Sequence, residues 1–193
     1  MRRVRADTDR VLTRLRDAEG GIGLIELLIA LTMLNIGLLA LVASLNSGMA
    51  TLNHASRVST ASLLAERRLE LYRGVGATAV GLHEASVTAR YTGETVYGCD
   101  PAVMDPALTC SAASRTAQVY LATCTATVER CMPTRVVTGP DGQRYRVDTY
   151  VVATTPAATG PVRPVKLVTV VVRDAGDLER MYARHQSTFD EGT

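Results

Sequence analysis

The chain of 193 residues carries 21 Lys and Arg against 19 Asp and Glu, and 47% of its residues are hydrophobic. This length suits one globular domain with attachments rather than two full domains. The first 21 residues hold six Arg and four acidic residues, so 15 basic and 15 acidic side chains remain in the rest. A neutral body exerts no net pull on a phosphate backbone, so no nucleic-acid partner is expected.

The first predicted element is a membrane-spanning helix over residues 22–45, directly after the Arg-rich start of the chain. Glu26 is the only charged residue among these 24. At about 1.5 Å per residue, the stretch is long enough to cross a bilayer core of about 30 Å. No Lys or Arg follows it until Arg57. The positive-inside rule therefore predicts that residue 1 lies in the cytoplasm and residue 193 outside, with the helix in membrane lipid.

The helical pattern continues beyond the membrane segment, because apolar residues still recur every three or four positions. These residues are Leu45, Met49, Leu52, Ala55, Val58, Ala61, Ala65, Leu69 and Tyr72. Gly74 and Gly76 then supply the backbone freedom that ends helices. The pattern predicts one helix over residues 22–73, about 78 Å long.

The remainder, residues 74–193, is predicted to form a globular antiparallel β domain. Segments rich in Val, Thr and Tyr suit a pleated, half-buried surface. They span residues 86–92, 118–128, 145–154 and 165–173. Turn signals precede the last two, at 139–142 and 156–164. We expect a sheet with one face on the helix and one in solvent, and a last edge strand within 178–189, where helix-forming residues leave a helix as the alternative.

Four cysteines, Cys99, Cys110, Cys124 and Cys131, all follow the membrane segment, on its predicted outer side. None has the spacing of a zinc knuckle or a redox dithiol. Four cysteines allow three connectivities, and the short separations favour Cys99 with Cys110 and Cys124 with Cys131. Free buried thiols are the alternative.

The junction between the Arg-rich start and the apolar stretch carries the most specific pattern in the chain. A charged leader is followed by Gly21, the apolar Ile22, Glu26 and a long Leu/Ile run. This combination resembles the prepilin cleavage and methylation signature of type IV pilins and of type II secretion pseudopilins. In that family a prepilin peptidase cuts after a Gly, methylates the new amino terminus and leaves a Glu as the fifth mature residue. The resemblance assigns the cleavage site to Gly21 and Ile22, N-methylation to Ile22 and filament assembly to Glu26.

The resemblance implies an α+β fold of the type IV pilin kind, with a long N-terminal helix packed on a C-terminal antiparallel sheet. A carboxylate in a lipid-facing helix costs several kcal/mol unless it finds a partner. In the family, that partner is the positive amino terminus of a neighbouring subunit. The implied partners are other pilin-like subunits in a helical filament, the prepilin peptidase and a membrane assembly platform. The implied location is the cytoplasmic membrane, followed by a cell-surface or periplasm-spanning filament.

The chain departs from the commonest family pattern at Ile22, where Phe is usual, at Gly23, where Thr is frequent, and at Ala43, where major pilins have a helix-kinking Pro. The missing Pro favours a minor pilin or pseudopilin over a major pilin. The rival is a membrane-anchored extracellular binding module, such as an adhesin, that does not polymerise. Only the filament interpretation requires both Gly21 and Glu26.

The sequence contains none of the common catalytic motifs. The three His residues are widely separated, and no nucleophile elbow or phosphate-binding glycine loop is present. We therefore expect a structural subunit without catalytic residues, cofactor or metal.

Overall fold

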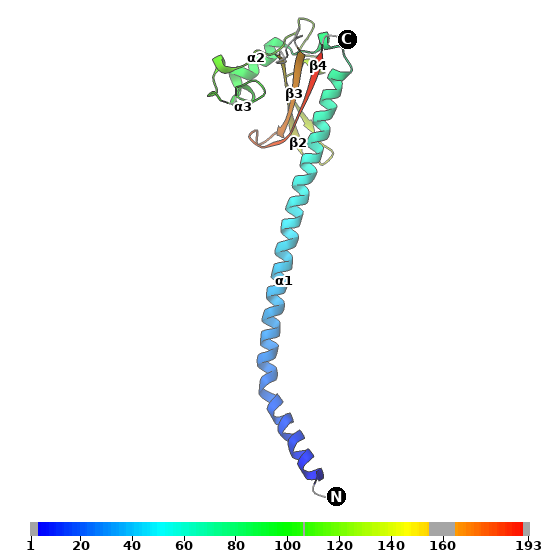
Figure 1. Ribbon diagram of the computed structural model, residues 1–193, viewed down its shortest axis with the longest axis vertical. Helices are drawn as coiled ribbons and strands as arrows, with labels where there is room; N and C mark the ends of the chain where they lie inside the picture. The colour runs from blue at the N-terminus through cyan, green and yellow to red at the C-terminus, as the bar shows by residue number, and fades with distance from the viewer. Residues whose placement is uncertain (1–3, 106, 155–164, 191–193) are drawn as a thin grey trace, which may run out of the picture. The chain divides into compact units, whose positions relative to one another are not determined.

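The computed structural model describes residues 4–105, 107–154 and 165–190, with side chains from residue 23 onward. The chain forms two compact units, Met1–Asn53 and His54–Thr193. Helix α1 (Val4–Arg73), which contributes to both, is followed by short helices and then by a sheet (Figure 1). The molecule therefore belongs to the α+β class, with one long apolar N-terminal helix and an antiparallel sheet.

Helix α1 ends where the sequence predicted but begins earlier. Its last residue is Arg73, and Gly74 closes the final turn by donating its N–H to the Glu70 carbonyl at 3.1 Å. The predicted start at residue 22 is wrong, because the helix already runs from Val4. Each internal glycine costs a helix only about 1 kcal/mol, and the Arg, Leu and Ala residues around Gly20 and Gly21 favour the helical state.

The last five turns of α1 belong to the second unit and carry the predicted apolar face. Ala61, Ala65, Leu69 and Tyr72 are fully or almost fully buried, at spacings of four, four and three residues. Arg57 adds a polar contact through the Tyr182 hydroxyl at 3.1 Å. This part of the helix is an integral piece of the globular core.

Short helical elements fill the segment between α1 and the sheet. They are η1 (Ala77–Ala79), α2 (Glu84–Gly93), α3 (Thr95–Gly98), η2 (Ala112–Ser114) and η3 (Glu129–Cys131). The strand predicted over 86–92 is wrong, because this segment is α2. Val87 and Tyr91, one turn apart, turn toward the core, so the helical period outweighed the β-branched composition. The strand predicted over 118–128 is also wrong, since only Gln118 and Tyr120 form single bridges there.

The sheet is a meander of four antiparallel strands in the order β1-β2-β3-β4. The strands are β1 (Thr134–Thr138), β2 (Arg144–Thr154), β3 (Val165–Asp174) and β4 (Met181–Asp190). The strands predicted over 145–154 and 165–173 and the edge strand within 178–189 are confirmed, whereas β1 was not predicted. The predicted turn at 139–142 joins β1 to β2, and Gly142 adopts φ 73°, which favours glycine. The turn predicted at 156–164 lies outside the described residues.

Both faces of the central strands are covered, so the predicted solvent-exposed face is wrong. Residues 145–152 of β2 are all buried. Thr149 faces α1 and accepts a hydrogen bond from Arg68 Nε at 3.0 Å, while Tyr150 stacks on Tyr97 of α3 with ring centroids 4.5 Å apart. Within this unit, α2 and α3 lie on the side of the sheet away from α1 (Figure 1). The helices and loops between residues 77 and 131 supply this second layer.

Candidate functional site

The first candidate region is the exposed part of α1, where sequence analysis placed the assembly residue Glu26. Every residue from 23 to 56 is exposed, including the large apolar side chains from Leu24 to Leu52. Among the described residues, Gly23–Arg73 is the one helical stretch long and apolar enough to cross a membrane, by length and composition. No described side chain of its own unit covers this apolar surface, and an apolar surface of this extent is typical of a membrane or protein contact.

Glu26 is the single charged side chain in the exposed stretch 23–45. Ile22 lies one helical turn earlier, about 6 Å along the axis, and Gly21 directly precedes it. Both residues have helical backbone, and their side chains are outside the described part of the structure. The structure therefore brings position 22 and the Glu26 carboxylate to neighbouring turns of one helix.

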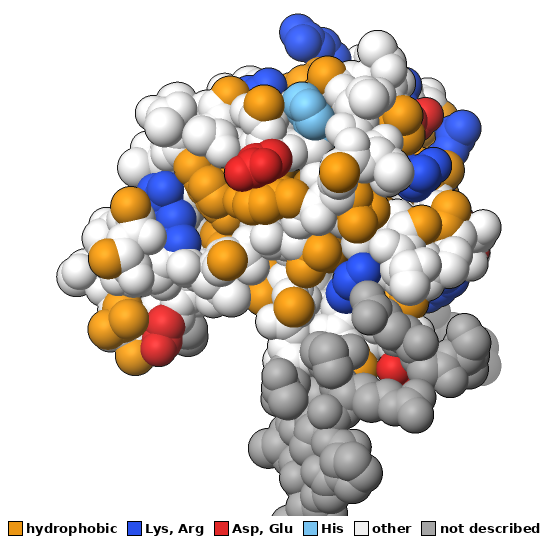
Figure 2. Space-filling view, turned by 90° about the horizontal axis from the view of Figure 1, so that it is seen from above, with side chains coloured by type: hydrophobic (Ala, Val, Ile, Leu, Met, Phe, Trp, Pro, Cys, Tyr) orange, Lys and Arg blue, Asp and Glu red, His pale blue; other side chains and the backbone are white. Residues whose placement is uncertain are grey.

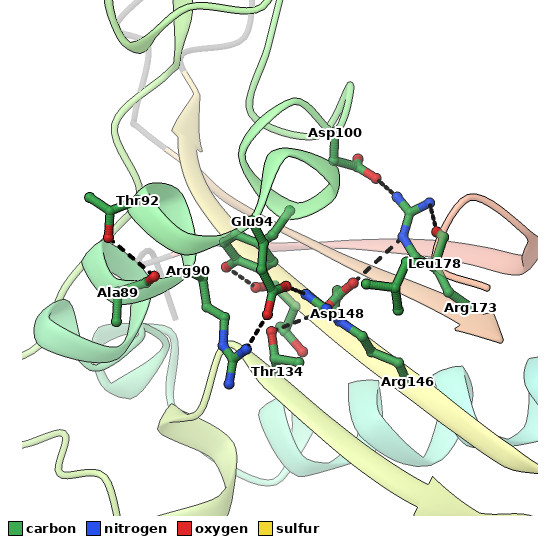
Figure 3. Close-up of polar contacts among 12 residues, drawn as sticks. Ala89, Arg90, Thr92, Glu94, Asp100, Thr134, Arg146, Asp148, Arg173 and Leu178 are labelled. Carbon is green, nitrogen blue, oxygen red and sulfur yellow. Dashed lines mark hydrogen bonds and ion pairs between the residues drawn. The ribbon is translucent and has the colours of Figure 1, made fainter. Parts of the chain in front are cut away.

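The second region is a buried charge network on the α2 and α3 side of the sheet (Figure 3). Its centre is the fully buried Asp148, whose Oδ1 accepts hydrogen bonds from Arg146 Nε and Thr134 Oγ1, both at 2.8 Å. Arg173 Nε lies 3.5 Å from the other carboxylate oxygen. Two buried arginines thus compensate one buried acid.

The network continues outward through two further acids. Glu94 pairs with both Arg146 and Arg90. Asp100 pairs with Arg173 and, through its other oxygen at 3.1 Å, with Arg184. These pairs tie α2 and the segment that follows α3 to strands β2, β3 and β4. The network therefore stabilises the globular unit by joining these helical segments to the sheet, and its charged side chains pair with one another.

The pKa shifts follow burial and pairing. Burial raises the pKa of the Asp148 carboxyl, and Arg146 opposes this shift. Burial would also raise the pKa of Glu94, but Arg146 and Arg90 outweigh it and hold that pKa below its ordinary value. Sequence reasoning missed the network. The available signal was charge at inward positions of apolar strands, as at Arg146 and Asp148.

The four cysteines form the two bridges that the sequence favoured. Cys99 pairs with Cys110 and Cys124 with Cys131, each with Cα atoms 5.4 Å apart. Cys110 is exposed, whereas Cys124 and Cys131 are buried. Within the described part of the chain, no group of three or more His, Cys, Asp or Glu residues is arranged to hold a metal ion.

Figure 2 shows one face of the globular unit. In this view, the Lys and Arg side chains lie scattered among hydrophobic and uncharged ones.

Comparisons with protein-family models, curated proteins and solved structures give no match to this chain. Function therefore has to be argued from the two regions themselves.

Proposed function

We propose that this chain is a structural subunit, a minor pilin or pseudopilin, of a type IV pilus-like filament. A prepilin peptidase would cut it after Gly21 and methylate Ile22. The mature protein would lie in the cytoplasmic membrane, with its globular unit outside, until an assembly platform draws it into the filament. There its N-terminal helix would pack against those of other subunits.

One observation carries this proposal: a lone carboxylate, Glu26, one turn beyond the Gly21 and Ile22 junction in an otherwise apolar, fully exposed helical stretch. A charge at the centre of a bilayer costs about 2.5 to 3.5 kcal/mol on insertion scales, and less near the edge. A helix that only anchored a domain would be better without it. A helix that must meet the amino terminus of a neighbouring subunit gains a specific ion pair from it.

The test separates cleavage from assembly. The protein is expressed with a prepilin peptidase in a host that assembles such filaments, and sheared surface fractions and membranes are analysed by mass spectrometry. The parent protein should begin at a methylated Ile22. Gly21→Leu should leave an uncut precursor in the membrane. Glu26→Leu should be inserted and cut normally but should be missing from filaments.

A matched control is Asn35→Leu, which removes a different polar side chain from the same exposed stretch and should assemble as the parent does. A terminus at Met1, or one near residue 45, would refute the processing step. If Glu26→Leu entered filaments as well as the parent, the ion-pairing step would be wrong. A membrane-anchored extracellular module that does not polymerise would then be the better description.

A further inference from the structure

A groove opens between the last turns of α1 and strand β1, wholly within the unit His54–Thr193. We refer to it as the α1–β1 groove, and its volume is about 200 Å³. Leu64 and Leu71 of α1 and Val137 and Val147 of the sheet form its apolar lining. Pockets for small-molecule ligands usually measure about 300 to 1,000 Å³. The groove is therefore sized for one or two side chains of a partner rather than for a larger ligand.

Positive charge is in excess in this groove. Arg67, Arg68 and Arg135 line it together with one acid, Glu129. Glu129 forms an ion pair with Arg135, in which about half of each side chain is exposed, 56% and 50%. Exposed ion pairs contribute only about 0 to 1 kcal/mol. A competing carboxylate could therefore displace Glu129 at little cost.

Arg68 is the buried cation among these three arginines, with only 6% of its surface exposed. Its guanidinium donates to Thr149 Oγ1 at 3.0 Å and to the backbone carbonyls of Glu129 and Met132 at 2.8 and 2.5 Å. All three acceptors are neutral, and no carboxylate of the described residues lies within the 4.0 Å of an ion pair. A buried cation without a counter-ion favours an anion in the adjoining space.

Strand β1 offers a way to hold such an anion in place. It lies at the edge of the sheet, and among the described residues only β2 pairs with its backbone. An open edge is a template for a further strand. Arg135 and Val137, two residues apart on β1, both line the groove. Side chains two residues apart share one face of a strand. An extended segment along β1 would therefore present one side chain to Arg135 and the side chain two residues away to Val137.

We propose that the α1–β1 groove binds an extended segment of a partner protein in which an acidic and an apolar side chain lie two residues apart, on the same face of the strand. The segment pairs with the free edge of β1, places a carboxylate near Arg67 and Arg135 in the field of Arg68, and buries an apolar side chain against Leu64 and Val147. Glu129 is the internal placeholder that it displaces. This inference does not depend on filament assembly.

The test uses the full chain in a non-ionic detergent and a fluorescein-labelled hexapeptide, Ser-Thr-Glu-Thr-Leu-Ser, in which Glu and Leu lie two residues apart, followed by fluorescence anisotropy at low salt. Arg135→Glu should weaken binding at least about tenfold, as should replacing the glutamate of the peptide by glutamine. Glu129→Gln should strengthen binding, because the placeholder is removed. Methylating alternate backbone nitrogens of the peptide should abolish binding, because a strand can then no longer form.

Arg180→Glu is the matched control, since it makes the same charge change at an exposed residue between β3 and β4 and should leave binding unchanged. Equal binding of the glutamine peptide would overturn the proposal, and so would a Glu129→Gln variant that binds no more tightly. Displacement by inorganic phosphate at the peptide's own concentration would show a general anion site and would overturn the assignment to a peptide. Arg135 and Glu129 are both exposed, so these substitutions leave the core intact.

Discussion

The exposed part of helix α1 and the globular unit differ in how their charged side chains are paired. In residues 23–53 every side chain is exposed, and the one charge of the apolar stretch, Glu26, has no counter-ion among the described residues. In the globular unit, Asp148 is fully buried and has Arg146 and Arg173 beside it. The charge network is paired within the chain, whereas the counter-ion of Glu26 is left to the partner proposed above.

The largest expected effect comes from breaking the internally completed region. Asp148→Ala removes the centre of the charge network and leaves Arg146 and Arg173 buried without their shared carboxylate. Loss of one partner of a buried pair costs about 3 to 5 kcal/mol. We expect that loss in the unfolding free energy measured by chemical denaturation. Asp177→Ala, which removes the exposed pair with Arg180, should cost less than about 1 kcal/mol.

The disulfides sharpen the comparison by distinguishing accessible from buried bonds within the globular unit. Denatured, unreduced protein should show no free thiol. Because Cys110 is exposed and Cys131 is fully buried, mild reduction should open the Cys99–Cys110 bridge first. Full reduction should lower the unfolding free energy by about 2 to 4 kcal/mol. Alkylation followed by peptide mass spectrometry reports the order, and simultaneous labelling of all four cysteines would contradict it.

Features that depend on residues close together in the sequence were predicted correctly, whereas features that depend on residues far apart were not. The end of α1, strands β2 and β3, the turn at Gly142 and the cysteine pairing depend on neighbours in the chain, and these predictions are confirmed. The charge network depends on residues far apart, since Asp100 and Arg173 are separated by 73 positions. No local pattern joins such residues. Strand β1 escaped prediction because it has only five residues, among them a charged one.

Helix α2 shows a second reason for failure. Its sequence contains Val87, Thr88, Tyr91 and Thr92, residue types that favour strands in isolation. Burial of Val87 against the sheet and of part of Tyr91 beside it selected the helical period instead. Tertiary packing thus overrode local propensity, and it also supplied the second layer of the fold. Of the candidate sites, the junction at Gly21 to Glu26 was proposed from sequence alone and stays a prediction, whereas the α1–β1 groove required the coordinates.

Glu94 gives a smaller, pH-dependent effect. Its two arginine partners hold its pKa below the ordinary value, so its contribution to stability is present above the pKa of the unfolded carboxyl and is lost as pH falls through the folded one. Glu94→Gln should cost about 1 to 3 kcal/mol at pH 7. It should also flatten the fall in stability of the globular unit below about pH 4.3. Thermal denaturation of parent and variant from pH 7 to pH 3 measures both, and parallel curves would contradict the assignment.

The smallest effect is expected in the exposed half of α1, where the chain itself provides no neighbours. A Cβ added at Gly37 meets nothing within 4 Å, whereas one added at Gly81 would lie 2.6 Å from Leu121 Cγ. Gly81→Ala should therefore destabilise the globular unit by about 1 to 3 kcal/mol through overpacking. Gly37→Ala should leave that unit within about 0.5 kcal/mol of the parent, since it touches no part of it. Denaturation of the two variants side by side measures this contrast. The second measurement is the amount of each variant in the proposed filaments. There we expect Gly37→Ala, which leaves the stability of the globular unit unchanged, to have the larger effect. If Gly37→Ala folds normally but is depleted from filaments, another helix must approach Gly37 closely, and the contact that the single chain lacks would be located. If it enters the proposed filament normally, Gly37 is not a point of close contact between helices in that filament.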